Sequence, residues 1–196
     1  MKNIILIISL LFYSFSVVNA QKHVFFKSPW KGDVTVAKES KGGLNMPTIT
    51  VPERCWHMDA SLQDISIYKD VQLNDANKNK TIWCSFLALK EKGNSHLGLS
   101  FEKDNDKKIL VEAGVSQTPQ LIVVRIDYSE KTDRAYIFYS PTAAAVPDLE
   151  NAVSVLSGDF DFNRIRILAE KGSKGMVSDV FIGTNYHDVV RPNKLQ

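Results

Sequence analysis

The sequence of 196 residues has few of the side chains on which most metal and redox sites depend. It contains two cysteines, Cys55 and Cys84, and four histidines scattered along the chain. Zinc sites and dithiol redox pairs need thiolates or imidazoles at short spacings, so neither is predicted and no metal ligand is assigned. Each cysteine lies beside a tryptophan in an apolar run. Two alternatives therefore stay open for the pair, a disulfide or two buried thiols.

An excess of charge of one sign is also missing. Lysine and arginine number 24, aspartate and glutamate number 22, and the formal net charge is +2. A protein that binds nucleic acid presents a concentrated basic face to the phosphate backbone. No run of this sequence supplies such a face, and nucleic acid is therefore not an expected partner.

Long apolar runs are confined to the N-terminus. Lys2, an apolar stretch at 4–18 and the small residue Ala20 predict a secretory signal peptide over residues 1–20. The stretch is short for a membrane span and no second long apolar run follows, so we expect no transmembrane segment after signal cleavage. The alternative is a retained N-terminal anchor. Residues 21–196 have the size of a single domain, which we expect to be secreted, periplasmic or at the cell surface.

Apolar stripes with the period of a helix are scarce, whereas alternation with period 2 in β-branched and aromatic residues is common. Eleven segments fit a strand: 23–27, 34–37, 48–51, 64–71, 81–90, 97–102, 107–112, 120–127, 134–140, 164–168 and 176–184. So many short strands do not suit one open sheet, and two packed sheets or a barrel accommodate them better. The sequence therefore predicts an all-β fold.

Short polar connections between these strands predict hairpins. They are the turns at 103–106, 129–133 and 172–175, which are built from residues that tolerate turn geometry. The last of them would join 164–168 to 176–184 as a closing hairpin. In that hairpin Arg166 is predicted to meet Asp179 across the strand pair, as a structural ion pair.

One long segment, residues 141–158, breaks the alternating pattern. Pro141 and Pro147 exclude a regular central strand there, and the alanines and acidic residues suit a loop with one helical turn at 148–152. We interpret the segment as the long crossing connection between sheets that a Greek-key sandwich needs.

Five segments taken in order resemble a known family. They are IWCSFLALK at 82–90, HLGLSF at 96–101, LIVVRIDYSEKTDRAYIFYSP at 121–141, FNRIRI at 162–167 and SDVFIGTNYHDVV at 178–190. Their order and spacing resemble the concanavalin-A-like lectin/glucanase domains, of the laminin-G-like jelly-roll type, in secreted bacterial proteins. The resemblance implies a two-sheet antiparallel jelly-roll sandwich with one concave sheet. It implies function loosely, because the superfamily includes sugar-binding modules, glycoside hydrolases, polysaccharide lyases and non-catalytic spacers.

The paired carboxylates that glycoside hydrolysis requires are not evident in this sequence. The glucanases of the superfamily carry a Glu-x-Asp-x-x-Glu series on one strand, which lines a cleft with carboxylates. The nearest acidic series here, 102–106, falls in a predicted hairpin turn. The sequence therefore favours a non-catalytic lectin-like module or a spacer, and no catalytic residue is assigned. The alternative is a glycan-active hydrolase or lyase that uses the concave face, where four side chains could converge: Arg125, Tyr136, Tyr139 and Arg166.

Sugar binding needs an aromatic platform for the ring and planar polar groups for its hydroxyls. Arg125 and Asp127 share one face of a predicted strand. Trp30 and Trp56 neighbour loop-like sequence and are expected to be exposed. The predicted ligand-binding residues are therefore Arg125, Asp127, Trp56 and Trp30, and the predicted partner is a glycan or a cell-surface polysaccharide.

No cofactor is predicted, although calcium stays open. Lectins of this fold often hold calcium with loop oxygens, which residues 104–106, or Asn74 and Asp75, could supply. The glycine-spaced loop of a strong calcium signature is missing from the sequence. The metal is therefore left unassigned.

Overall fold

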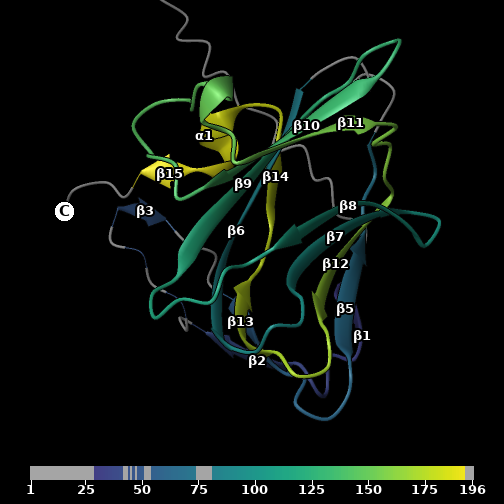
Figure 1. The fold of residues 1–196 in the computed structure, drawn as a ribbon, viewed down its shortest axis with the longest axis vertical. Helices are drawn as coiled ribbons and strands as arrows, with labels where there is room; N and C mark the ends of the chain where they lie inside the picture. Colours follow the sequence, from purple (N-terminus) through teal and green to yellow (C-terminus); the bar gives the residue numbers. More distant parts are fainter. Residues whose placement is uncertain are drawn as a thin grey trace, which may run out of the picture.

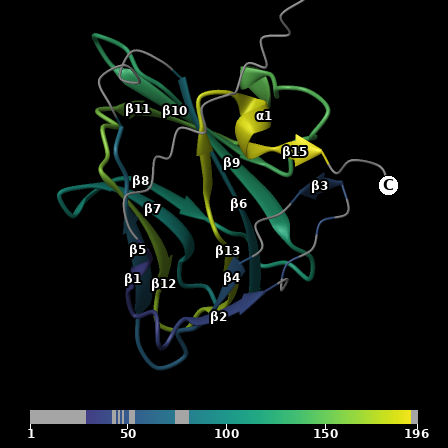
Figure 2. The ribbon, with the colours of Figure 1, turned by 180° about the vertical axis from the view of Figure 1, so that it is seen from behind.

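The protein folds as two large antiparallel sheets packed as a sandwich, which is not closed into a barrel (Figure 1 and Figure 2). The computed structural model describes residues 29–41, 44, 46, 48–50, 54–73 and 81–192. The predicted signal peptide at 1–20 and the predicted strand at 23–27 lie outside these residues. The all-β fold class is confirmed, and the two-sheet arrangement agrees with a jelly roll.

The smaller of the two sheets has five strands in the order β1, β5, β12, β7, β8. Their bounds are β1 (Lys31–Gly32), β5 (Ile65–Asp70), β12 (Arg164–Ala169), β7 (Leu97–Lys103) and β8 (Asp106–Glu112). The predicted hairpin between β7 and β8 is confirmed. At its turn Asp104 and Asn105 have φ of 50° and 73°, the left-handed conformation that a two-residue hairpin turn needs at both positions.

The larger sheet has eight strands in the order β11, β10, β9, β6, β13, β4, β2, with β14 also paired to β6. Their bounds are β11 (Ser154–Gly158), β10 (Asp133–Tyr139), β9 (Gln120–Asp127), β6 (Thr81–Lys92), β13 (Lys174–Ser178), β4 (Arg54–Asp59), β2 (Lys38–Lys41) and β14 (Phe181–Gly183). The predicted hairpin of β9 and β10 is confirmed. Four further elements complete the described chain: α1 (Tyr186–Val189), η2 (Leu149–Asn151), and the paired strands β3 (Ile49–Thr50) and β15 (Arg191–Pro192).

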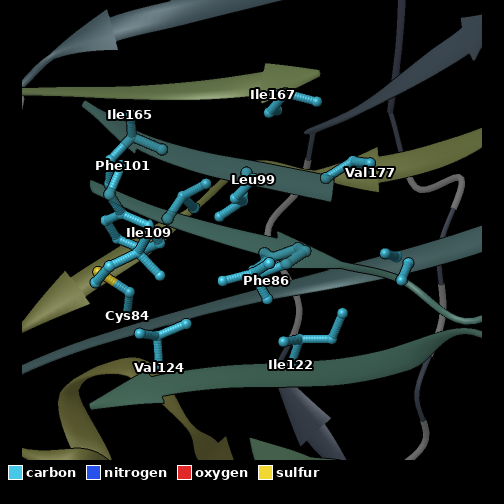
Figure 3. Packing of buried hydrophobic residues seen from close by; sticks show 14 of the residues in the cluster. Cys84, Phe86, Leu99, Phe101, Ile109, Ile122, Val124, Ile165, Ile167 and Val177 are labelled. Carbon is cyan, nitrogen blue, oxygen red and sulfur yellow. The ribbon is translucent and has the colours of Figure 1, made fainter. Parts of the chain in front are cut away.

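The main core lies between the two sheets. Alternation turns every second residue of each strand inward, so that Val124 of β9 and Leu99 of β7 both enter this layer, as Figure 3 shows. Phe101 of β7 meets Phe162 edge-on, with ring centroids 5.1 Å apart. Each fully buried side chain of this size contributes about 1.5–3 kcal/mol relative to an exposed one. The sandwich is therefore stabilised mainly by this layer.

A second apolar layer covers part of the outer face of the eight-stranded sheet. Leu121 and Val123 of β9 and Trp83 of β6 point outward and are buried there. Tyr186 of α1 packs edge-on against Trp83 at 5.2 Å between ring centroids, and its hydroxyl donates to the carbonyl of Thr142. Residues buried on both faces of a sheet produce a continuous apolar run, which explains the sequence LIVV at the start of β9.

The predicted closing hairpin is wrong. β12 pairs with β5 and β7 in one sheet, whereas β13 pairs with β4 and β6 in the other. The intervening residues 170–173 therefore cross between sheets, and Ser173 is buried there with its hydroxyl donating to the carbonyls of His96 and Glu170. Alternation shows which face of a strand is apolar, but two strands on opposite sheets have the same pattern as two strands of a hairpin.

The crossing connection is also in a different place. The helical turn predicted at 148–152 is present as η2, but the residues after it form the edge strand β11, which pairs with β10 in the same sheet. The chain crosses afterwards, at 159–163, to begin β12. Further strand predictions differ. The segment 34–37 is a turn that precedes β2, and the predicted strand 176–184 is divided between β13 and β14. β2 and β4 were not predicted; in β4, charged and polar residues interrupt the apolar pattern.

Candidate binding site

The exposure expected for Trp30 and Trp56 is wrong. Trp30 is 7% exposed and Trp56 is 3% exposed, and both belong to the core between the sheets, with ring centroids 6.0 Å apart. The segment that resembles a loop around Trp56 is strand β4, whose alternation turns Trp56 and Met58 inward. Neither indole is therefore placed to stack on a sugar at the surface.

Arg125 and Asp127 share one face of β9, as the alternation predicted. Their neighbours Val124 and Ile126 enter the core between the sheets, so the two polar residues point outward. Arg125 Nε donates to Asp127 Oδ1 at 2.8 Å, and Thr81 Oγ1 of β6 donates to the same oxygen at 2.7 Å. The guanidinium carbon of Arg125 lies 5.3 Å from the ring centroid of Trp83. The arginine is therefore held by an ion pair on one side and an aromatic ring on another.

The strand register extends this pair into a polar row across four strands. Thr81 of β6 is opposite Asp127, Asp127 is opposite Arg134 of β10, and Arg134 is opposite Ser157 of β11. Arg134 and Ser157 are exposed. We refer to Thr81, Arg125, Asp127, Arg134 and Ser157 as the polar face. It begins where the second apolar layer ends, because Arg125 lies beside the buried Trp83 and Tyr136 in the register.

The polar face has hydrogen-bonding capacity that the described residues do not use. A guanidinium has five N–H donors, and the described residues accept one of those of Arg125, the Nε–H. Arg134 makes no hydrogen bond or ion pair within the described part of the chain. An arginine whose orientation is already fixed loses little side-chain entropy when its remaining donors bind a ligand.

The four side chains considered for a glycan-active enzyme do not converge. Arg125 and Tyr136 lie on the outer side of the eight-stranded sheet, with 5.9 Å between the guanidinium carbon and the ring centroid. Tyr139 packs against the core between the sheets, and its hydroxyl donates to the carbonyl of Glu112 at 2.6 Å. Arg166 lies on the outer side of the five-stranded sheet. The four residues therefore occupy three separate surfaces.

The acidic series at the β7–β8 hairpin consists of side chains that already have partners. Glu102, at the end of β7, is 2% exposed and pairs with Arg166, whereas Asp104 in the turn accepts a hydrogen bond from Asn163 Nδ2 at 2.7 Å. Asp106 is 3.0 Å from Lys108. The three carboxylates do not line one cleft, which the glucanase arrangement would require.

Of the two predicted sources of calcium ligands, Asn74 and Asp75 lie outside the described residues, and the β7–β8 turn fits calcium poorly. Asn105 Oδ1 accepts a hydrogen bond from Arg164 Nη1 at 2.6 Å, so a guanidinium cation lies where a calcium ion would need this oxygen. Asp70, which shares Arg164 with Asn105, accepts hydrogen bonds from Lys31 and Arg164. These hydrogen bonds keep the pKa of the Asp70 carboxyl below its usual value. Within the ranges that the structure describes, no three His, Cys, Asp or Glu side chains gather as metal ligands.

Comparison with known protein families and with curated proteins finds no match for this chain. Among the described residues no helix is both long and apolar enough to cross a membrane. Sequence reasoning identified Arg125 and Asp127 but missed Thr81, Arg134 and Ser157, because only the register between strands shows which residues stand in one row. The geometry of these five residues is therefore the main indication of a function.

Proposed function

We propose that the protein is a secreted, non-catalytic module that binds carbohydrate on the polar face, with a glycan or a cell-surface polysaccharide as its partner. The observation that carries this proposal is the geometry of Arg125. Asp127 holds its Nε and Trp83 lies beneath it, while its terminal nitrogens have no partner within the described residues. Oriented, unfilled donors of this kind suit the hydroxyl oxygens of a sugar.

The shape and composition of the polar face suit an extended ligand. Four of its residues stand in one row across four adjacent strands, which are about 4.8 Å apart. The row alternates hydroxyl, carboxylate, guanidinium and hydroxyl groups, so that it offers both donors and acceptors. A polysaccharide chain lying along the row would meet one polar side chain at each strand.

The same residues argue against hydrolysis on this face. Glycoside hydrolases use two carboxyl groups, one on each side of the scissile bond. The polar face contains one, Asp127, and Oδ1 of that carboxylate already accepts hydrogen bonds from Arg125 and Thr81. A single acid in this state supports binding better than proton transfer. Export by the predicted signal peptide would bring the module to extracellular glycans.

Retention on immobilised polysaccharides tests the proposal. The purified protein would be applied to a panel of neutral and acidic polysaccharides and compared with Arg125→Gln and Arg134→Gln. Loss of a hydrogen bond from a charged group weakens binding by about tenfold or more, so Arg125→Gln is expected to elute early. Arg54→Gln is the matched control, because Arg54 is an exposed strand arginine 3.8 Å from Glu39 in β2, outside the polar face.

Two results would contradict the proposal. Equal retention of wild type and Arg125→Gln on every retained polysaccharide would show that the polar face does not bind. Release of reducing sugar ends from the same polysaccharides by the purified protein would show that it is a glycan-active enzyme. The reducing-end assay should be run on the fractions used for retention.

A further inference from the structure

A second polar site lies at one end of the sandwich, away from the polar face. It is a cavity of about 490 Å³ that is wide open to solvent, at the end of the sandwich where β6, β8, β9 and β10 come together. Its polar lining residues are Lys90, Asn94, Glu112, Gln120 and Tyr139. The volume is within the range of small-molecule sites, which is about 300–1,000 Å³.

Lys90 is the unusual residue of this cavity. It continues the inward side of β6 after Phe86 and Ala88, so a lysine stands where the strand pattern has apolar residues. Its side chain is 4% exposed, and Nζ donates to Glu112 Oε1 at 2.6 Å. An ammonium has three N–H donors, and the described residues accept one of them. A buried charged donor with unused capacity needs further acceptors in the cavity.

Two further polar groups of the cavity, on Tyr139 and Gln120, are each held by a backbone contact. Tyr139 donates its hydroxyl to the carbonyl of Glu112 at 2.6 Å, and burial raises the pKa of Tyr139, so that the hydroxyl stays protonated. Gln120 Oε1 accepts the N–H of Gly114 at 3.1 Å, which leaves its amide NH₂ without a partner among the described residues. The Glu112 carboxylate is half-exposed and keeps one oxygen, Oε2, free of hydrogen bonds. Donors and acceptors are therefore held side by side.

This arrangement selects one chemical class of ligand. The Lys90 ammonium can donate to an oxygen, and the adjacent Glu112 carboxylate can accept from a hydroxyl. A vicinal diol satisfies both, because one hydroxyl accepts from the amine while its neighbour donates to the carboxylate. An anionic group at this position would be repelled by the Glu112 carboxylate, and a cationic group would be repelled by the Lys90 ammonium. The lining therefore fits a neutral sugar.

We propose that this cavity is a second binding site, which takes a neutral pyranose and recognises two vicinal hydroxyls through Lys90 and Glu112. Gln120 and the Tyr139 oxygen complete the polar wall. The site is separate from the polar face: Lys90 and Tyr139 point into the space between the sheets, whereas Arg125 points away from it. Binding in the cavity and retention of polysaccharide on the polar face are therefore independently measurable.

Titration with methyl pyranosides, followed by ¹H–¹⁵N NMR of the whole protein, tests this site. The panel contains the gluco, manno, galacto and xylo forms, their monodeoxy analogues and the corresponding methyl uronic acid. Saturable shifts are expected at Gly114 and at the Gln120 side chain for at least one sugar. Lys90→Met, which keeps the apolar stem and removes the amine, is expected to weaken that binding by about tenfold or more, and the matching deoxy analogue to weaken it similarly.

The controls keep the two sites apart. Lys103→Met removes another lysine paired with a carboxylate, Asp161 at 2.8 Å, near the β7–β8 turn outside this cavity, and Arg125→Gln alters the polar face. Both variants are expected to bind the sugar as wild type does. If Lys90→Met unfolds, Glu112→Gln decides, because the Gln amide oxygen can still accept a hydrogen bond from the buried Lys90 ammonium, while its NH₂ replaces the oxygen that would accept from the sugar.

Three results would overturn this proposal. They are the absence of saturable shifts with every pyranoside, wild-type affinity in Glu112→Gln or a folded Lys90→Met, and tighter binding of the uronic acid than of the neutral sugar. None of these results bears on retention of polysaccharide by the polar face, which Arg125→Gln tests by itself.

Discussion

Arg166 and Glu102 form a bidentate ion pair between the neighbouring strands β12 and β7. Arg166 Nε lies 2.8 Å from Oε1 of the carboxylate, and Nη2 lies 2.9 Å from Oε2. The guanidinium also donates to Ser66 Oγ at 3.1 Å and lies over Tyr68, 5.1 Å from the ring centroid. The hydrogen bond to Glu102 raises the pKa of Arg166 above its usual value. The pair therefore ties the three central strands β5, β12 and β7 together on their outer side.

Removing one partner of this pair should be costly. Glu102 is 2% exposed. In Arg166→Met its carboxylate loses its counter-ion, and the free energy of unfolding is therefore expected to fall by about 3–5 kcal/mol. Urea unfolding measures this loss. The double variant with Glu102→Gln has no unpaired charge and should recover part of it. An equal loss in the single and double variants would contradict the prediction, and Arg54→Met, at an exposed pair, should change stability by about 0.5 kcal/mol or less.

The two core tryptophans should differ in their response to substitution. Trp30 donates its indole N–H to Asp179 Oδ1 at 3.2 Å, whereas Nε1 of Trp56 has no partner in the described part of the chain. Trp30→Phe removes a hydrogen bond as well as ring area, and Trp56→Phe removes ring area alone. Trp30→Phe is therefore expected to be the more destabilising by about 1 kcal/mol in chemical unfolding. Trp56→Phe should retain polysaccharide as the wild type does, and lost retention in a folded variant would show that this ring acts in binding.

The two cysteines are expected to remain thiols. Cys55 points to the outer layer of the eight-stranded sheet and Cys84 to the core between the sheets, so the sheet itself separates their sulfur atoms. Burial also raises the pKa of Cys84. A thiol reagent should label neither residue in the native protein and both in denaturant, as counted by mass spectrometry. An intact mass short of two hydrogens, restored by reduction, would contradict this prediction.

His96 should make stability depend on pH. It is 5% exposed, and burial lowers its pKa, with Lys107 and Lys90 acting in the same sense and Glu112 and Glu170 opposing them. Below the ordinary pKa of 6.5 the unfolded chain binds a proton at this histidine that the folded protein does not. Stability is therefore unaffected well above that pH and is lost progressively as the pH falls through and below it.

Thermal unfolding between pH 8 and pH 5 measures this effect. His96→Phe, which has no proton to bind, should flatten the pH dependence in that range. His57→Gln serves as the control because His57 is exposed on β4. A wild-type slope in His96→Phe would assign the pH dependence to other groups.

Much of the local structure follows from the sequence. Alternation with period 2 located β9 within its observed bounds and placed Arg125 and Asp127 on the face opposite Val124. The Asp-Asn turn between β7 and β8 was predictable because these residues tolerate the left-handed backbone that the hairpin needs. These features depend on neighbouring residues alone, so they can be recognised without a structure.

Other features required the tertiary structure. Alternation describes β4 poorly, so Trp56 was expected at the surface although its strand turns it into the core. The polar row joins Thr81 to Ser157, and the cavity joins Lys90 to Glu112, through the pairing and stacking of strands. A period of two residues gives each side chain a face but no partner strand.

The sequence by itself therefore determined that this chain folds into strands with one apolar face, where several of them turn, and which residues of β9 face outward. The tertiary structure alone decided which sheet each strand joins and which polar groups meet. The physical reason is that side-chain direction is set within a strand, whereas contacts between strands depend on the packing of distant segments around a common core.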